Sequence, residues 1–313
     1  ATELGVATCD EALALRAAGI TEPILAWLLH DGARVSEALE QRVRLSVTSA
    51  AQVDEVARIA AALGVVGEVE LEVETGMHRS GGAREDWQAF FAAAREQERE
   101  HRLRVVGVWT HLAGTAPEHF TGPLEQLAEA VEMARAFGLR PRRHAAASVA
   151  AVIDPRTRLD LVRLGASLFG IEPVPQSPVG LETVAVWESH VTQVRDVDAG
   201  DLVGYGREPV DHATRLALIP LGYADGLSRR ASPGLGVTIG GHRFPFAGAI
   251  SMDQAVIDIG AAAVSVGDPV VLVGDPAEGA RSLREWAETL GTIPQEILTG
   301  LGPRVARIEG GHS

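Results

Sequence analysis

The chain has 313 residues and a formal net charge of −14, with 46% hydrophobic and 22% charged residues. This length is sufficient for a large core and is typical of two domains. The acidic excess argues against a nucleic-acid surface, which needs clustered positive charge. The single cysteine, Cys9, excludes an internal disulfide and favours a reducing, cytoplasmic location. No apolar run reaches membrane-spanning length and no segment resembles a signal peptide, so we expect no membrane insertion and no export.

All 28 basic residues are arginine, so the chain contains no lysine. Lysine is the side chain that joins covalently to carbonyl compounds during catalysis. Lysine-based covalent catalysis is therefore impossible within these 313 residues.

The first half of the chain alternates short apolar runs with segments of helical periodicity, which predicts βα units around a parallel sheet. We expect Asp10 to cap the first helix, and Ser49 to cap a helix that ends at Gly64. Along residues 68–75, glutamates alternate with apolar residues and should occupy the opposite face of a strand. The predicted strands are Leu4–Thr8, Pro23–Leu29, Arg44–Thr48, Glu68–Thr75, Val105–His111, Arg143–Ser148 and Leu161–Gly170.

Seven βα units are an unusual number for this architecture. Eight strands close a barrel and remove its edges, whereas seven leave an edge exposed. Either the strand count is wrong by one, or the chain begins one unit late. Because Ala1 stands almost directly before a strand, we favour the second interpretation. The predicted fold is α/β, a TIM-type (β/α)8 barrel whose first βα unit is absent from this chain.

Three prolines, Pro173, Pro175 and Pro178, mark a linker, after which helical periodicity becomes rare. We therefore expect a barrel domain over residues 1–178 and a mainly β domain over residues 179–313. Gly240-Gly241 separates two alternating runs and is typical of a hairpin turn. The predicted elements of the second domain are strands Val184–Val194, Arg215–Pro220, Val237–Phe244, Ala255–Ile259 and Pro269–Val273 and the helix Ser282–Leu290.

The run Asp160–Gly170 carries one basic residue, Arg163, within an otherwise apolar segment. A buried guanidinium is costly to desolvate unless it meets an acceptor. One interpretation is an arginine paired with a carboxylate at the end of a neighbouring strand. The other is an arginine presented to a cofactor, with Gly165 allowing backbone amides to approach a phosphate. The run alone leaves both interpretations open.

Polar residues at the carboxyl ends of barrel strands are the candidates for chemistry, since barrel active sites lie there. They are Arg79, His111, Ser148 and Arg163. Singly, each is explained as a local cap or a core ion pair. Together they provide a cation for a carboxylate, an imidazole, a hydroxyl for a phosphate and a buried guanidinium. This set suits an anionic amino acid together with a phosphorylated cofactor.

Six runs with chemistry-bearing residues follow one another along the chain. They are ETGMHRSGG (Glu74–Gly82), WTHLAGT (Trp109–Thr115), LVRLGASLFG (Leu161–Gly170), VGYGREP (Val203–Pro209), PLGYADGLSRR (Pro220–Arg230) and SMDQ (Ser251–Gln254). In sequence, order and spacing they resemble the alanine racemase family. The resemblance implies a (β/α)8 barrel followed by a β domain, a head-to-tail homodimer, and pyridoxal 5′-phosphate (PLP) as cofactor, with no metal.

The resemblance implies a cofactor site in the barrel. Arg163 would bond the pyridine nitrogen of PLP, and because an arginine keeps its proton, the ring would stay unprotonated. Ser148 and the backbone amides around Gly165 and Ala166 would hold the phosphate. His111 would connect Arg163 with the catalytic tyrosine, and this positively charged pair would lower the pKa of the phenol.

The resemblance also implies roles for residues that contact the substrate. Tyr205, contributed by the partner subunit, would be the base that removes the α-proton of L-alanine. Arg79 and the Met252 backbone would hold the substrate carboxylate. Tyr223 would line the entrance, and Asp253 would belong to the same substrate-binding group.

The chain departs from the family at three places. The family joins PLP to a lysine in a Lys-Ala-x-x-Tyr-Gly-His-Gly motif after its first strand, and this chain has neither the motif nor a lysine. We therefore expect an N-terminally truncated racemase. Glu72 stands where many members carry a carbamylated lysine, so its carboxylate would orient Arg79, or would be paired elsewhere. Ala147 replaces an asparagine that precedes the phosphate-binding Ser148.

The function implied is the PLP-dependent interconversion of L- and D-alanine for the synthesis of cell-wall peptides. The missing lysine favours an alternative, a PLP-binding or structural homologue without catalysis. A PLP decarboxylase on the same barrel is disfavoured by Tyr205 and Arg163. Whether alanine alone or also serine fits the site stays open.

Overall fold

The computed structural model describes residues 1–30, 33–174, 179–205 and 209–309. The chain divides into two compact units. The first comprises Ala1–Gly165 with Pro173–Val179, and the second comprises Ala166–Glu172 with Gly180–Ser313. The expected boundary after Pro178 lies outside the described residues. No helix in the described ranges is long and apolar enough to cross a bilayer.

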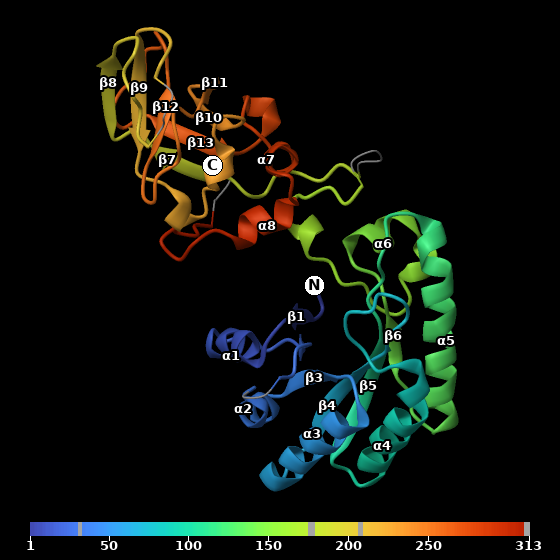
Figure 1. The fold of residues 1–313 in the computed structure, drawn as a ribbon. Helices are drawn as coiled ribbons and strands as arrows, with labels where there is room; N and C mark the ends of the chain where they lie inside the picture. The colour runs from blue at the N-terminus through green and yellow to red at the C-terminus, as the bar shows by residue number, and fades with distance from the viewer. Residues whose placement is uncertain (31–32, 175–178, 206–208, 310–313) are drawn as a thin grey trace. The chain divides into compact units, whose positions relative to one another are not determined.

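A parallel sheet of six strands organises the first unit, and the strands are neighbours in the order in which they follow along the chain. Figure 1 shows helices α3, α4 and α5 along the outer side of this curved sheet. The strands are β1 (Leu4–Val6), β2 (Ile24–Ala26), β3 (Val43–Val47), β4 (Gly67–Glu72), β5 (Leu103–Trp109) and β6 (Arg142–His144). The helices are α1 (Cys9–Ala17), α2 (Val35–Glu40), α3 (Ala50–Leu63), α4 (Trp87–Arg99), α5 (Thr121–Ala136) and α6 (Ser148–Ile153), with 3₁₀ turns η1 (Arg84–Asp86), η2 (Pro117–Phe120) and η3 (Pro155–Thr157).

The helix caps follow the local sequence. Ser49 caps α3 by accepting a hydrogen bond from the Gln52 amide, and Gly64 ends the helix with φ of 68°, as predicted. The expected cap at Asp10 is wrong, because Thr8 caps α1 two residues earlier and forms a capping box with Glu11.

The sheet curls enough for side chains near its first and last strands to meet at one end. Glu3, directly before β1, accepts hydrogen bonds from Arg142 of β6 at 2.6 Å and from Arg44 of β3 at 2.9 Å. Only a strongly curved sheet brings these three side chains together, since β1 and β6 lie at opposite edges. The predicted barrel is thus present in this chain as a curled parallel sheet of six strands.

The seventh predicted strand, Leu161–Gly170, is wrong. Only a single parallel bridge joins Leu161 to His144, and the residues Ala166–Phe169 form the 3₁₀ turn η4. Leu168 and Phe169 are exposed, so this apolar run does not have the two covered faces of a central strand. The chain leaves the sheet at Arg163, whose amide bonds the Ala146 carbonyl.

The second unit is mainly β, as predicted, with two antiparallel sheets in the orders β11-β10-β13-β7 and β12-β9-β8. The expected strand Val184–Val194 is split into β7 and β8, and α8 was not predicted. Gly240 and Gly241, with φ of 57° and 79°, make the predicted hairpin turn. The elements are β7 (Trp187–His190), β8 (Gln193–Val197), β9 (Thr214–Ile219), β10 (Gly236–Ile239), β11 (His242–Pro245), β12 (Ala255–Asp258), β13 (Pro269–Val273), α7 (Leu283–Leu290), α8 (Pro294–Thr299), and the 3₁₀ turns η5 (Tyr223–Asp225), η6 (Arg229–Ala231) and η7 (Pro276–Glu278).

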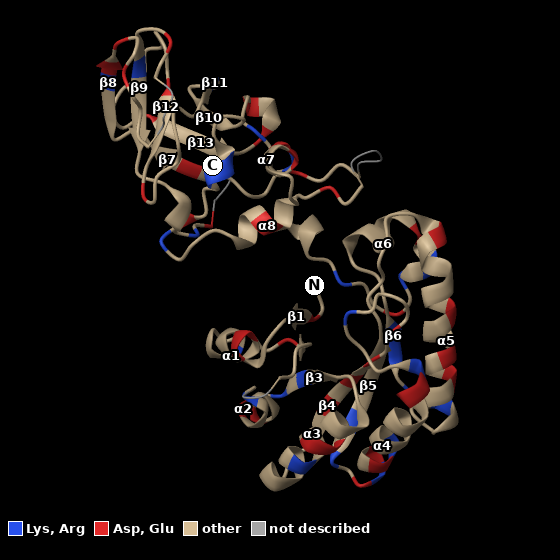
Figure 2. Ribbon diagram, viewed as in Figure 1, with Lys and Arg blue, Asp and Glu red and all other residues tan. Residues whose placement is uncertain are grey.

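Each unit has its own apolar core. In the first unit the core includes Trp87, Phe90 and Phe91 between the sheet and its helices, and in the second it includes Trp187 and Trp286. Figure 2 shows acidic and basic residues mixed along the outer helices of the first unit. Many of these residues are three positions apart on one helix and pair with each other, which favours solubility more than stability.

Candidate active site

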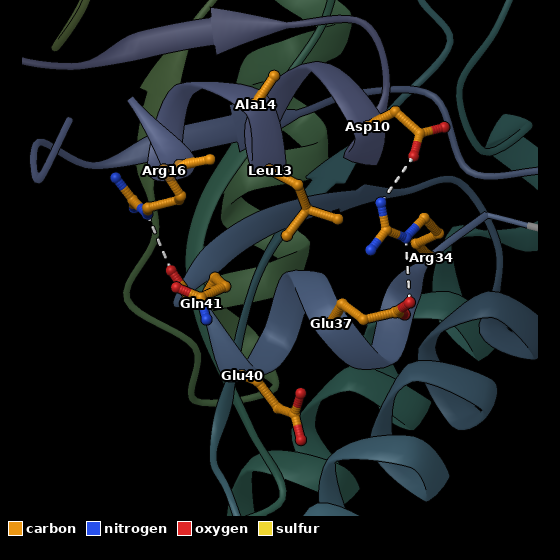
Figure 3. A pocket seen from close by; sticks show the side chains of 9 residues that line it. Asp10, Leu13, Ala14, Arg16, Arg34, Glu37, Glu40 and Gln41 are labelled. Carbon is orange, nitrogen blue, oxygen red and sulfur yellow. Dashed lines mark hydrogen bonds and ion pairs between the residues drawn. The ribbon is translucent and has the colours of Figure 1, made fainter. Parts of the chain in front are cut away.

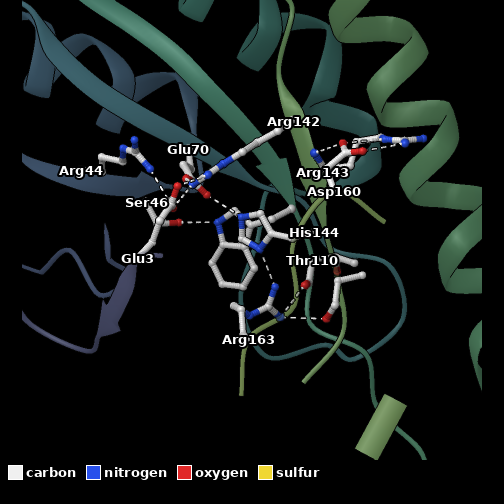
Figure 4. A network of polar contacts seen from close by, with 12 residues as sticks. Glu3, Arg44, Ser46, Glu70, Thr110, Arg142, Arg143, His144, Asp160 and Arg163 are labelled. Carbon is white, nitrogen blue, oxygen red and sulfur yellow. Dashed lines mark hydrogen bonds and ion pairs between the residues drawn. The ribbon is translucent and has the colours of Figure 1, made fainter. Parts of the chain in front are cut away.

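Arg163 lies at the centre of a polar network inside the curved sheet (Figure 4). One terminal nitrogen, Nη1, is 2.6 Å from His144 Nδ1. The other, Nη2, donates to the carbonyls of Thr110 at 2.9 Å and Ala145 at 2.8 Å. Within the described ranges, no carboxylate lies at ion-pairing distance from Arg163, so the interpretation of a carboxylate-paired arginine is wrong. The structure instead presents a partly buried cation that is held by neutral acceptors.

The guanidinium of Arg163 is also held by aromatic contacts. Its carbon Cζ lies 4.7 Å from the centroid of the Trp109 ring, a cation–π contact. Trp109 stacks on the His144 ring with centroids 5.5 Å apart and donates from Nε1 to Ser46 Oγ at 3.0 Å. Burial lowers the pKa of Arg163 to about 10, which still leaves it cationic at neutral pH. The position of this charge is therefore fixed by the fold.

The proton of His144 can be assigned from its neighbours. Arginine only donates hydrogen bonds, so His144 Nδ1 must accept from Arg163 and its proton must be on Nε2. Nε2 lies 2.5 Å from Glu70 Oε2 and donates to it. Burial lowers the pKa of His144, which agrees with a neutral ring. Both His144 and Glu70 are fully buried.

Glu70 supplies the negative charge behind this histidine. Burial alone would raise the pKa of Glu70, but the hydrogen bonds from His144 and from Arg142, at 2.6 Å, outweigh it and lower the pKa to about 2. Neither Glu70 nor His144 was among the predicted site residues. The sequence signal was the row of glutamates on one face of the predicted strand 68–75, which turns out to face the polar network.

His111, a predicted catalytic residue, is the second imidazole beside Arg163. Its Nδ1 lies 3.3 Å from Arg163 Nη2 and accepts from it, which leaves the proton on Nε2. Burial, followed by the charges of Arg163 and Arg79, lowers the pKa of His111 to about 4. The positive charge of this pair is therefore carried by Arg163, and the His111 imidazole is neutral.

Glu72 is buried at the end of β4 and accepts a hydrogen bond from Ser80 Oγ at 2.9 Å. Burial raises the pKa of Glu72, against the opposing effects of Ser80 and Arg79. Arg79 is exposed, and the described residues show no ion pair between it and Glu72. Glu72 thus fixes the segment that carries Arg79 through Ser80, and the Gly82 amide strengthens this connection by bonding the Glu72 carbonyl at 2.8 Å.

Several residues that are expected to hold the phosphate, or that are next to them in the chain, have hydrogen-bond donors without described partners. Ser148 is buried as the first residue of α6, and its hydroxyl has no partner among the described residues. The amides of Gly165 and Ala166 also donate to no described backbone group. The hydroxyl of Ser167 is buried and without a partner among those residues. The buried, unpartnered Ser167 hydroxyl and the unbonded amides of Gly165 and Ala166 are donors that fit a phosphate group, so the residues present are compatible with PLP.

The predicted substrate residues of the second unit lie on its loops. Tyr205 is 78% exposed and follows Gly204, whose φ is 59°, while Gly206 lies outside the described residues. Tyr223 and Met252 are on two loops that are joined by backbone hydrogen bonds. The Met252 amide donates to no described group, so it is free to bind an anion.

A surface groove between α1 and α2, with a volume of about 630 Å³, is lined by none of the predicted site residues (Figure 3). All of its charged side chains except Glu40 have described partners. Arg34 pairs with Asp10 and Glu37, and Arg16 donates to the Gln41 carbonyl. We assign it no role.

Comparisons with known proteins agree with this geometry. The family model for the alanine racemase N-terminal domain matches residues 1–173, and that for the C-terminal domain matches residues 184–309. The chain is 39% identical to an alanine racemase of Frankia casuarinae over 98% of this chain and 82% of that protein. It is 40% identical to one of Salinispora tropica over 99% of this chain and 85% of that protein.

Solved structures give the same result. Alanine racemase from D-cycloserine producing Streptomyces lavendulae superimposes with a TM-score of 0.95 at 36% identity, covering 100% of this chain and 84% of that one. The Streptomyces coelicolor enzyme gives 0.94 at 38% identity, with 98% and 84% covered. The fold is that of a barrel-type PLP-dependent racemase with a mainly β second domain. The chain belongs to the alanine racemase family.

Proposed function

We propose that this protein carries out the reaction of its family, the PLP-dependent interconversion of L- and D-alanine, and so supplies D-alanine for peptidoglycan precursors. The observation that carries the proposal is the partly buried Arg163 cation, which among the described residues is hydrogen-bonded only to neutral acceptors. Such a cation is costly unless a ligand uses it. A solved relative from Bartonella henselae contains covalently bound pyridoxal phosphate.

Arg163 would donate a hydrogen bond to the pyridine nitrogen of the cofactor. Because an arginine does not give up its proton, the ring nitrogen stays unprotonated, which limits how strongly the ring withdraws electrons. Ser148 and the amides of Gly165 and Ala166 are the proposed phosphate ligands. PLP, when bound, acidifies the α-proton of the amino acid joined to it.

The other proposed roles concern the substrate and its proton. Arg79, fixed through Glu72 and Ser80, and the Met252 amide would hold the alanine carboxylate. Tyr223 would line the entrance, with Asp253 beside it.

Tyr205 would remove the α-proton of L-alanine. A phenol has a pKa of about 10, and lowering it by about 3 units requires about 4 kcal/mol of differential stabilisation. The Nε2–H of His111, backed by the Arg163 cation, is a suitable donor to the phenolate oxygen. We propose that Tyr205 acts on the barrel of a partner subunit in a cytoplasmic, head-to-tail homodimer.

The second base in the family is the lysine that binds PLP, and these 313 residues contain none. Any such lysine would have to lie outside them. This observation favours a second candidate function, a PLP-binding homologue that does not catalyse racemisation. The two candidates agree on the cofactor site and differ in whether protons are exchanged.

The test uses full-length protein with PLP in D₂O. We expect deuterium to enter the α-position of both enantiomers of alanine. Tyr205→Phe should lower the rate of deuterium exchange into L-alanine by at least about 100-fold, the usual contribution of a general base. The variant should still bind PLP. Loss of exchange and of cofactor binding together contradicts the role of Tyr205. A wild-type protein that binds PLP and exchanges no protons supports the second candidate.

A further inference from the structure

Arg304, near the C-terminus of the described chain, bridges two carboxylates on different loops of the second unit. Its Nε donates to Asp225 Oδ1 at 2.9 Å, and its Nη1 donates to Asp253 Oδ1 at 2.8 Å. Asp225 ends the turn that begins with Tyr223, and Asp253 directly follows Met252. A single guanidinium thus joins the two loops that carry the proposed substrate contacts, without itself being one of them.

The two loops are in close contact along their backbones. The Tyr223 amide bonds the Ser251 carbonyl at 3.0 Å, and the Ala224 amide bonds the Met252 carbonyl at 2.9 Å. A Cβ atom at Gly222 would lie 2.4 Å from both of these carbonyl oxygens, so only glycine allows this approach. Movement of either loop therefore moves the other.

The segment that carries Arg304 is fixed on the same turn. The Gly302 amide bonds the Asp225 carbonyl at 3.1 Å, and a Cβ at Gly226 would lie 2.7 Å from the Gly300 carbonyl oxygen. Asp225 is 7% exposed and also accepts from the Gly222 amide at 2.9 Å. Arg304 consequently reaches both aspartates from a backbone with little freedom to shift.

The charges around Met252 give this bridge a function. The Met252 amide donates to no described group; Met252 directly precedes Asp253, and its carbonyl accepts from the amide of Ala224, the residue before Asp225. A carboxylate ligand at this amide would be repelled by the charges of both aspartates. Arg304 places one positive charge between the two aspartates and offsets that repulsion.

We propose that Arg304 is a positioning residue for the substrate carboxylate. It holds the Tyr223 turn against the Met252 loop and offsets the charge of Asp225 and Asp253, so that the Met252 amide can bind an anion. This inference rests on the proposed function, which assigns Met252 to the substrate carboxylate. Arg304 would not contact the substrate itself and would act through the Tyr223 turn and the Met252 loop.

The test compares two probes whose binding does not need a lysine, measured by calorimetry on the 313-residue chain. Pyridoxamine 5′-phosphate tests the cofactor site alone, and N-phosphopyridoxyl-L-alanine adds the alanine carboxylate. We expect Arg304→Ala to weaken binding of the alanine adduct about tenfold, a typical effect of one charge at a partly exposed site. Its affinity for pyridoxamine 5′-phosphate should be unchanged.

Three further variants separate positioning from simple destabilisation. Arg307→Ala removes an arginine of the same segment whose one side-chain bond to the described residues is to the Leu301 carbonyl, and it should change neither affinity. Arg304→Lys keeps the charge and should recover part of the loss. Arg304→Ala combined with Asp253→Asn removes the unbalanced charge and should also recover part.

Failure of the role of Arg304 and failure of the proposed PLP-dependent function give different binding results. A wild-type chain that binds neither probe overturns both. A wild-type chain that prefers the alanine adduct, with the same preference in Arg304→Ala, overturns only the role of Arg304. Equal loss of both affinities in Arg304→Ala, without recovery in the double variant, also overturns it, since a collapsed unit would behave in this way.

Discussion

The buried Glu70 carboxylate determines which nitrogen of His144 carries the proton, and His144 in turn contacts Arg163 in the candidate cofactor site. Glu70 accepts from Nε2 of this ring, and this leaves Nδ1 free to accept from Arg163. Reversing the tautomer would place two N–H groups against each other, and Arg163 would lose an acceptor. The tautomer is therefore a condition for the observed position of the guanidinium.

The substitution Glu70→Gln tests this dependence. The amide nitrogen of glutamine can donate to His144 Nε2 and so favours the wrong tautomer. We expect affinity for pyridoxamine 5′-phosphate to fall about tenfold and stability to fall by about 1–3 kcal/mol, because a buried polar group loses its partner. Nitrogen-15 NMR of the imidazole reports the tautomer, and titration reports affinity. Glu68→Gln is the control, since Glu68 pairs with Arg44 and Arg104 and not with His144. An unchanged tautomer with unchanged affinity would refute this account.

His111 should make stability depend on pH. Burial lowers the pKa of His111 from 6.5 to about 4. Between these values the unfolded chain binds a proton that the folded chain does not, so stability falls as pH drops from 6.5 to 4 and this contribution then levels off. The expected loss is about 1–3 kcal/mol, reduced from the full shift because the ring is not completely buried. Urea unfolding at several pH values should show a flatter profile for His111→Gln than for wild type, and parallel profiles would contradict the assignment.

At the scale of elements, the success of sequence reasoning depended on whether the signal was local. The Ser49 cap, the Gly64 stop and the Gly240-Gly241 turn were predicted because each depends on a few adjacent residues. The run Leu161–Gly170 was wrongly predicted as a strand because its composition says nothing about Leu168 and Phe169 being exposed. Whether an apolar run is covered depends on distant parts of the chain.

The candidate site shows the same limit. Arg163 and the strand-end residues were selected because their charge was unusual in an apolar context, and the resemblance then gave them roles. Glu70 was overlooked because its partner His144 is 74 positions away. Arg304 was overlooked because its two aspartates are 79 and 51 positions away. Pairing over such separations is a property of the fold.

On the scale of the whole molecule, the proposed chemistry is divided between two units. Arg79, His111 and Arg163 belong to the first unit, whereas Tyr205 and Met252 belong to the second. If each Tyr205 serves the barrel of a partner, then a complete site combines the first unit of one chain with the second unit of another. Defects in the two units should then complement each other between chains.

Mixing two inactive full-length variants tests this arrangement. Tyr205→Phe and Arg79→Ala are unfolded together and refolded with PLP. Random pairing makes about half of the dimers mixed, and each mixed dimer has one intact site and one doubly defective site, so about a quarter of wild-type racemase activity should return. Each variant refolded alone is the control and should stay inactive. If Tyr205 served its own chain, every site in the mixed dimer would carry one defect and no activity would return, because both bases and the carboxylate ligand are needed at one substrate.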